Sequence, residues 1–98
     1  MKPEDIKTIG VLGGGVMGGG IAQVLAVAGY DIVLRDLNND LLEKSRQTIA
    51  EGRFGLRGGV ERGKITQQQM DEALARIKFT TKVEDLRDVD LLIEAIPE

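Results

Sequence analysis

Short apolar runs alternate with amphipathic stretches along this chain, a pattern typical of strands that alternate with helices. Residues 7–13 form an apolar run that a glycine closes, and residues 31–35 form a second run of strand length. Between them we expect a helix from about Val16 to Ala28, because apolar residues recur there at helical spacing. The predicted apolar face of this helix consists of Met17, Ile21, Val24, Leu25 and Ala28.

The residues after the second run predict a hairpin of two helices. Asn38 or Asn39 can cap the first helix, which we expect to reach about Leu56 although glycines interrupt its far end. Thr66 and Gln69 have the spacing of a capping box and mark the start of the second helix. The first helix carries Leu41, Leu42, Ser45 and Ile49 on one face, and the second continues through Met70, Ala73, Leu74 and Ile77.

Two more strands are expected near the end of the sequence, at residues 78–81 and 90–96, with a single turn at 83–87 between them. Because parallel strands are joined by right-handed crossovers, this order predicts an α/β fold. It is the first half of a Rossmann-type, doubly wound parallel sheet, with strand order 3-2-1-4 and a helical hairpin after the second strand. The last strand is expected at an open edge, through which we predict a homodimer or higher oligomer.

A glycine-rich turn after the first run predicts a dinucleotide-binding site. Gly13 permits a sharp turn, Gly15 lets the backbone approach a pyrophosphate, and Gly18 lets helix and strand pack closely. The start of the helix supplies unpaired N–H groups and a partial positive charge for the phosphates. Asp36 follows Gly18 by 18 residues, close to the spacing expected for a carboxylate that binds ribose hydroxyls.

Asp36 also bears on the choice between NAD and NADP. An arginine such as Arg35 can pair with the 2′-phosphate of NADP, but the alternation of a strand points Arg35 away from Asp36. A carboxylate at position 36 also repels that phosphate. NAD is therefore the expected cofactor.

The composition narrows the chemistry that the chain can perform. Its 98 residues suffice for one small domain, and with a net charge of −3 we expect no nucleic-acid partner. The sequence has no cysteine, no secretory signal and no apolar run long enough for a membrane span, which favours a cytoplasmic protein. Because it also has no histidine, we expect neither a metal site nor a catalytic residue within these 98 residues.

The segments GGGVMGGGIAQ and IEAIPE, with the helical hairpin between them, resemble the N-terminal NAD-binding domain of 3-hydroxyacyl-CoA dehydrogenases, above all the 3-hydroxybutyryl-CoA type. The resemblance implies oxidation of the 3-hydroxyl of an acyl-CoA to a ketone, with hydride transfer to NAD. It also implies that the amides of Val16 and Met17 face the pyrophosphate and that Asp36 holds the adenosine ribose. The residues that it places near the nicotinamide half of the cofactor are Ala95, Ile96 and Glu98.

The same resemblance implies a CoA site on the hairpin, but the chain departs from the family there. Where the family has hydroxyl and basic side chains, the aligned positions are Gly52 and Gly59. Arg53 and Arg57 are the candidate partners of the CoA phosphates, and Arg62 and Lys64 are further basic residues of the hairpin. The alternative is that these cations form a solvated surface.

The family's catalytic histidine lies beyond residue 98. Residues 1–98 are therefore expected to be a partial NAD-binding domain without the C-terminal catalytic and dimerisation domain, and to be inactive alone. Two other functions stay open at this point. One is an NADP-linked 3-hydroxyacid or 6-phosphogluconate type dehydrogenase, although these commonly carry Asn-Arg where this chain has Arg35-Asp36. The other is a non-catalytic nucleotide-binding or redox-sensing module.

Overall fold

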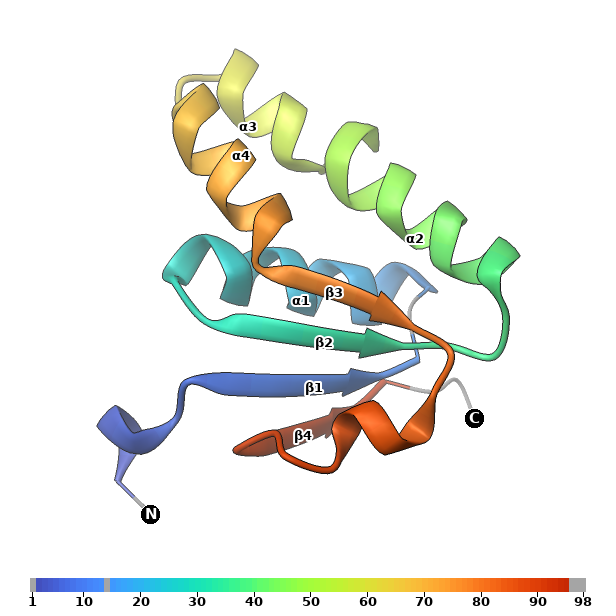
Figure 1. The fold of residues 1–98 in the computed structure, drawn as a ribbon. Coiled ribbons are helices and arrows are strands. Elements are labelled where there is room, and N and C mark those ends of the chain that lie inside the picture. Colours follow the sequence, from blue (N-terminus) through green and yellow to red (C-terminus); the bar gives the residue numbers. More distant parts are fainter. Residues whose placement is uncertain (1, 14, 96–98) are drawn as a thin grey trace.

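The computed structural model describes residues 2–13 and 15–95, which contain a parallel sheet of four strands (Figure 1). The strands are β1 (Thr8–Leu12), β2 (Asp31–Arg35), β3 (Ile77–Thr80) and β4 (Leu91–Glu94), and their order in the sheet is β3-β2-β1-β4. All the neighbouring strands are parallel. The predicted fold class and strand order are therefore confirmed.

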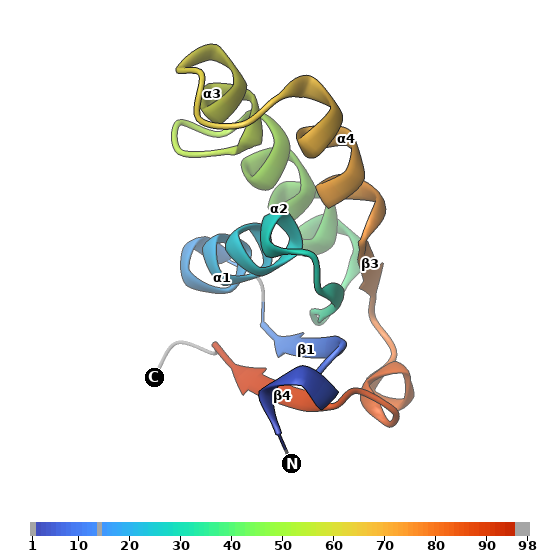
Figure 2. The same ribbon diagram turned by 90° about the vertical axis from the view of Figure 1, so that its left-hand side faces the viewer.

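Four α-helices connect the first three strands. They are α1 (Gly15–Ala28), α2 (Asn39–Glu51), α3 (Leu56–Glu61) and α4 (Gln67–Ala75), and the last three form the predicted hairpin after β2. Figures 1 and 2 show α1 lying along one face of the sheet, with the hairpin extending outward beyond α1 and β3. Asn38 caps α2 through a bond from the Leu41 N–H, and Thr66 and Gln69 form the predicted capping box of α4.

The two faces of the sheet are covered differently. The face toward the helices supplies Ile9, Val11, Ile32, Leu34 and Ile77 to the buried core. On the opposite face, the short 3₁₀-helix η2 (Val83–Leu86) and the residues after it pack against β1 at Gly10. A Cβ added at Gly10 would lie 2.8 Å from Leu86 Cδ2 and 3.1 Å from Val89 Cγ2, so glycine there lets this segment pack close to β1.

The predicted apolar face of α1 is wrong in part, because Ile21 and Leu25 pack against the core but Met17, Val24 and Ala28 do not. Met17 and Val24 have 68% and 65% of their surface exposed, while Ala22 and Ala26 are fully buried. Gly18, Ala22 and Ala26 recur every four residues and are buried, so a stripe of small residues faces the interior. The physical reason is that a stripe of small residues lets the helix approach the sheet more closely than larger side chains permit.

The boundaries of the hairpin also differ from the prediction. The first helix ends at Glu51 instead of continuing to Leu56, and α3 begins only at Leu56. A Cβ at Gly52 would lie 2.5 Å from Thr48 O, and one at Gly55 would lie 2.7 Å from Ile49 O, so the chain folds back tightly over the last carbonyls of α2. Ile77 belongs to β3 and not to the second helix. The last strand ends at Glu94, and Ile96 lies outside the described residues.

Candidate functional site

The strands β1, β2 and β4 end side by side at the carboxyl end of the parallel sheet. Leu12 is paired with Arg35 of β2 and with Glu94 of β4, so the residues that follow, Gly13, Asp36 and Ala95, lie side by side. Backbone bonds continue the sheet by one step, from Gly13 N to Arg35 O (2.9 Å) and from Ala95 N to Leu12 O (2.9 Å). In open α/β sheets, ligands bind in the crevice outside the carboxyl ends of the strands.

The glycine-rich turn lies at this end of the sheet and packs against the first turn of α1. Gly13 and Gly15 have φ angles of 94° and 61°, which side chains disfavour. A Cβ at Gly18 would lie 1.9 Å from Gly13 O and 3.5 Å from Ala95 Cβ. The turn, the start of α1 and the residue after β4 can therefore come this close only because Gly18 has no side chain.

The start of α1 is suited to an anion. The helix begins at Gly15, so the backbone amides of Val16 and Met17 belong to its first turn, where N–H groups lack partners within the helix. No acidic residue lies in that turn to neutralise the positive end of the helix. The Met17 side chain is exposed beside it. A cofactor with a pyrophosphate fits this cradle, because the backbone is open above Gly15, where an added Cβ would meet no atom within 4 Å.

Asp36 directly follows β2 and is held by its neighbours. Its N–H donates to Thr80 O (3.1 Å), and its Oδ1 accepts from the Leu37 N–H (2.8 Å). Arg35 is engaged elsewhere, since its Nε donates to Thr81 O (3.0 Å) in the segment after β3. Asp36 thus follows β2 at the carboxyl end of the sheet, beside Gly13, while the Arg35 guanidinium bonds β2 to the segment after β3.

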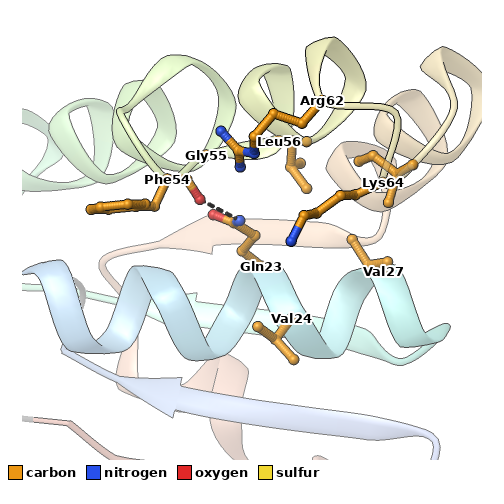
Figure 3. Close-up of a pocket in the computed structure, with 10 residues that line it drawn as sticks. Gln23, Val24, Val27, Phe54, Gly55, Leu56, Arg62 and Lys64 are labelled. Atoms are coloured by element: carbon orange, nitrogen blue, oxygen red, sulfur yellow. Dashed lines mark hydrogen bonds between the residues drawn. The ribbon is translucent and has the colours of Figure 1, made fainter.

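A pocket of about 240 Å³ lies between α1 and the hairpin (Figure 3). Its apolar part includes Val24 and Val27 of α1 and Leu56 of α3, and its charged part consists of Arg62 and Lys64. The other lining residues are Gln23, Phe54, Gly55, Gly59 and Ile65. Figure 3 shows Gln23 reaching from α1 to the turn after α2, where its Nε2 donates to Phe54 O at 2.8 Å.

The two arginines predicted to contact CoA do not line this pocket. Arg57 Nη1 donates to Gln67 Oε1 (2.7 Å), and its Nε lies 3.6 Å from Glu51 Oε2. Arg53 stacks over Phe54, with 5.4 Å between its guanidinium carbon and the ring centroid. The bond from Gln23 to Phe54 O was not predicted from the sequence, although Gln23 is the one polar side chain in the sequence of α1.

Two predicted cofactor contacts, Ile96 and Glu98, lie outside the described residues. Within residues 2–13 and 15–95, no cluster of three or more His, Cys, Asp or Glu side chains is arranged to hold a metal ion. None of the helices in the same part of the chain combines the length and apolar character that crossing a membrane requires.

Comparison with known proteins gives consistent matches. Residues 8–98 match the family described as 3-hydroxyacyl-CoA dehydrogenase, NAD binding domain. The chain is 38% identical over its whole length to the peroxisomal fatty acid beta-oxidation multifunctional protein of Oryza sativa subsp. japonica, of which it covers 13%. Among solved structures, it matches FadB2 of M. tuberculosis with a TM-score of 0.90 and 39% identity. It matches (S)-3-hydroxybutyryl-CoA dehydrogenase PaaH1 from Ralstonia eutropha with a TM-score of 0.88 and 39% identity.

These relatives are much longer than this chain. The two structural matches each cover 95% of the chain but only 32% of the solved protein. The similarity therefore concerns one part of those proteins, the part that the matching family describes as NAD-binding.

Proposed function

This chain belongs to the family of NAD-binding domains of 3-hydroxyacyl-CoA dehydrogenases, with NAD as its cofactor, and from that premise we propose the reaction that it serves. The proposed reaction is oxidation of an (S)-3-hydroxyacyl-CoA, with 3-hydroxybutyryl-CoA as the expected substrate, to the 3-oxoacyl-CoA. Support comes from the similarity to PaaH1, which is an (S)-3-hydroxybutyryl-CoA dehydrogenase. The observation that carries the proposal is the juxtaposition of Gly13, Gly18 and Asp36 at one sheet edge in a chain of this family.

The proposed role of these residues is to bind and orient NAD. When bound, NAD supplies the acceptor for the hydride from C3 of the substrate. The amides of Gly15, Val16 and Met17 at the start of α1 donate to the pyrophosphate, and Asp36 accepts from the adenosine ribose hydroxyls. Ala95, 3.5 Å from the position of a Cβ on Gly18, supports the turn from the β4 side and lines the nicotinamide half.

We assign no proton transfer to this chain. Oxidation of the alcohol releases the hydroxyl proton as well as the hydride, and a histidine is the usual acceptor near neutral pH. The sequence contains no histidine, so we expect no acetoacetyl-CoA-dependent oxidation of NADH by residues 1–98 alone. The resemblance implies that the catalytic histidine lies in the part of the relatives that this chain does not cover.

The pocket between α1 and the hairpin is the proposed contact for the CoA part of the substrate. Its two cations, Arg62 and Lys64, match the charge of CoA phosphates, and its valines match the methyl and methylene groups of the pantetheine arm. Arg53 and Arg57, named by the sequence analysis, stay candidates for outer contacts with the same phosphates. The alternative is that these four cations form a solvated surface. In that case, replacing each of them with alanine would leave the affinity for CoA unchanged.

The expected cytoplasmic location stays a prediction, since the rice relative is named as a peroxisomal protein. The NADP-linked alternative loses its support, because the matching family is NAD-binding and Arg35 is engaged with Thr81 O.

The test of cofactor binding is a fluorescence titration of the chain with NADH and NADPH, repeated with Asp36→Ala. Loss of hydrogen bonds to a charged group costs about 1.5–3 kcal/mol, so NADH affinity should fall roughly 10- to 100-fold. NADPH should bind the wild-type chain more weakly than NADH and should gain relative to NADH in the variant. Equal affinity of the wild-type chain for both cofactors would contradict the proposed role of Asp36.

A further inference from the structure

We propose that Gln23 is a positioning residue for the acyl-CoA pocket, which rests on the function proposed above. The sequence of α1 is otherwise made of glycine and apolar residues, and Gln23 is placed where α1 faces the hairpin. Its Nε2 donates to Phe54 O at 2.8 Å across 31 residues of sequence (Figure 3). Only the amide nitrogen can donate to a carbonyl, so the side chain has one productive orientation.

The Gln23 bond acts on a turn whose backbone bonds, from Gly52 N to Thr48 O (3.0 Å) and from Gly55 N to Gly52 O (2.9 Å), hold it to α2 and to itself but not to α1. The Phe54 ring is 77% exposed, so this large side chain contributes little burial to the turn. The buried anchor, Leu56 at 2% exposure, comes only where α3 begins. At the far end of α1, Arg76 Nη1 donates to Ala26 O (2.9 Å) and fastens α4 instead. The hydrogen bond from the Gln23 side chain to Phe54 O thus joins the turn to α1.

The tie matters for binding because the pocket is formed between the two parts that it joins. Val24 and Val27 come from α1, whereas Phe54, Gly55 and Leu56 come from the turn and α3. Arg62 lies back over α3, with its Nη1 2.8 Å from where a Cβ on Gly58 would be, so its position depends on where α3 lies. A shift of the turn relative to α1 would therefore move the apolar wall and the cation together.

The test compares Gln23→Met, which keeps the length but removes the donor, with Gln23→Glu, which keeps the shape but replaces the donor with acceptors. Gln47→Met, at an exposed position on α2, is the matched control. Titration calorimetry with coenzyme A and with NADH is run on the full chain, together with hydrogen exchange of residues 53–56. A net hydrogen bond is worth about 0.5–1.5 kcal/mol, so CoA affinity should fall roughly two- to tenfold in both Gln23 variants.

A purely structural role of Gln23 would lower the affinity for NADH and for CoA together, whereas a positioning role lowers the affinity for CoA alone. The proposal requires that NADH affinity stays at the wild-type level while CoA affinity falls and exchange of residues 53–56 rises. If both Gln23 variants bind CoA like Gln47→Met, the proposal is overturned. The double variant Arg62→Ala, Lys64→Ala separates the two claims: if it loses CoA affinity, the pocket stands without Gln23. If it and the wild-type chain bind CoA equally, or the wild-type chain binds none, the pocket and the role of Gln23 both fail.

Discussion

Gly18 and Gly20 lie two positions apart on α1 and differ in what a side chain would meet. A Cβ at Gly18 would overlap Gly13 O at 1.9 Å, whereas one at Gly20 would have no atom within 4 Å. Gly18→Ala should destabilise the chain by about 1–3 kcal/mol, because overpacking displaces the turn. Gly20→Ala should stabilise it by roughly 1 kcal/mol through helix propensity. Urea unfolding of the two variants measures both effects.

The same pair distinguishes a binding role from a folding role. With the turn displaced, Gly18→Ala should also lose NADH affinity in the folded protein, while Gly20→Ala should keep it. A Gly18→Ala chain that unfolds at the wild-type urea concentration would show that the turn tolerates a side chain, against the packing described above.

Residues whose positions follow from neighbouring elements could be placed from the sequence, and a residue whose partner lies in a separately packed turn could not. Gly13, Gly18 and Asp36 are read from spacing alone, because a strand, a turn and a helix fix them relative to one another. Gln23 finds its partner 31 residues away, in a turn whose position depends on the packing of α2 and α3. Nothing in the local pattern indicates that contact beyond the polarity of the side chain itself.

At the scale of elements, the strands and the buried faces of α2 and α4 were predicted more accurately than the buried face of α1. The strands β1 and β2 lie within the predicted runs, because a parallel strand buried on both faces is a continuous apolar segment. Helix α1 is apolar on nearly every side, so its periodicity does not distinguish the face that packs. Because α1 lies close to the sheet, Ala22 and Ala26 are buried between them, while Met17 and Val24 are exposed. The end of α2 was also missed, although the tight contacts of Gly52 and Gly55 are local and involve the carbonyls of Thr48 and Ile49.

At the scale of the whole molecule, Asp90 joins the start of β1 to the start of β4. Its Oδ2 accepts from Lys7 N (2.8 Å) and Thr8 N (3.1 Å), 83 and 82 residues away in sequence. These backbone bonds lower the pKa of Asp90 below its ordinary value of 3.8. Because the folded pKa is the lower one, the stabilisation is complete above the unfolded pKa and is lost as pH falls through the folded pKa.

Asp90→Asn should therefore reduce stability at neutral pH, and the difference from wild type should shrink as pH falls below about 4. Thermal unfolding between pH 2 and pH 7 measures this, with Asp88→Asn at a neighbouring exposed position as the control. A difference that is independent of pH would mean that the charge of Asp90 plays no part in holding the two strands.

Self-association through β4 is the last consequence of this sheet. Strand order puts β3 and β4 at the two edges of the described sheet, and the edges differ. The β3 strand carries Lys78 within it, a charge that discourages pairing, whereas the charge of β4, Glu94, is at its last residue and Leu91 and Leu92 are 43% and 45% exposed. We therefore expect the 98-residue chain to associate in a concentration-dependent way, measurable by sedimentation, and Leu92→Lys to shift it toward monomer. Leu37→Lys, at an exposed position away from that edge, should not. A wild-type chain that stays monomeric at high concentration would mean that exposed apolar surface on β4 is insufficient for pairing.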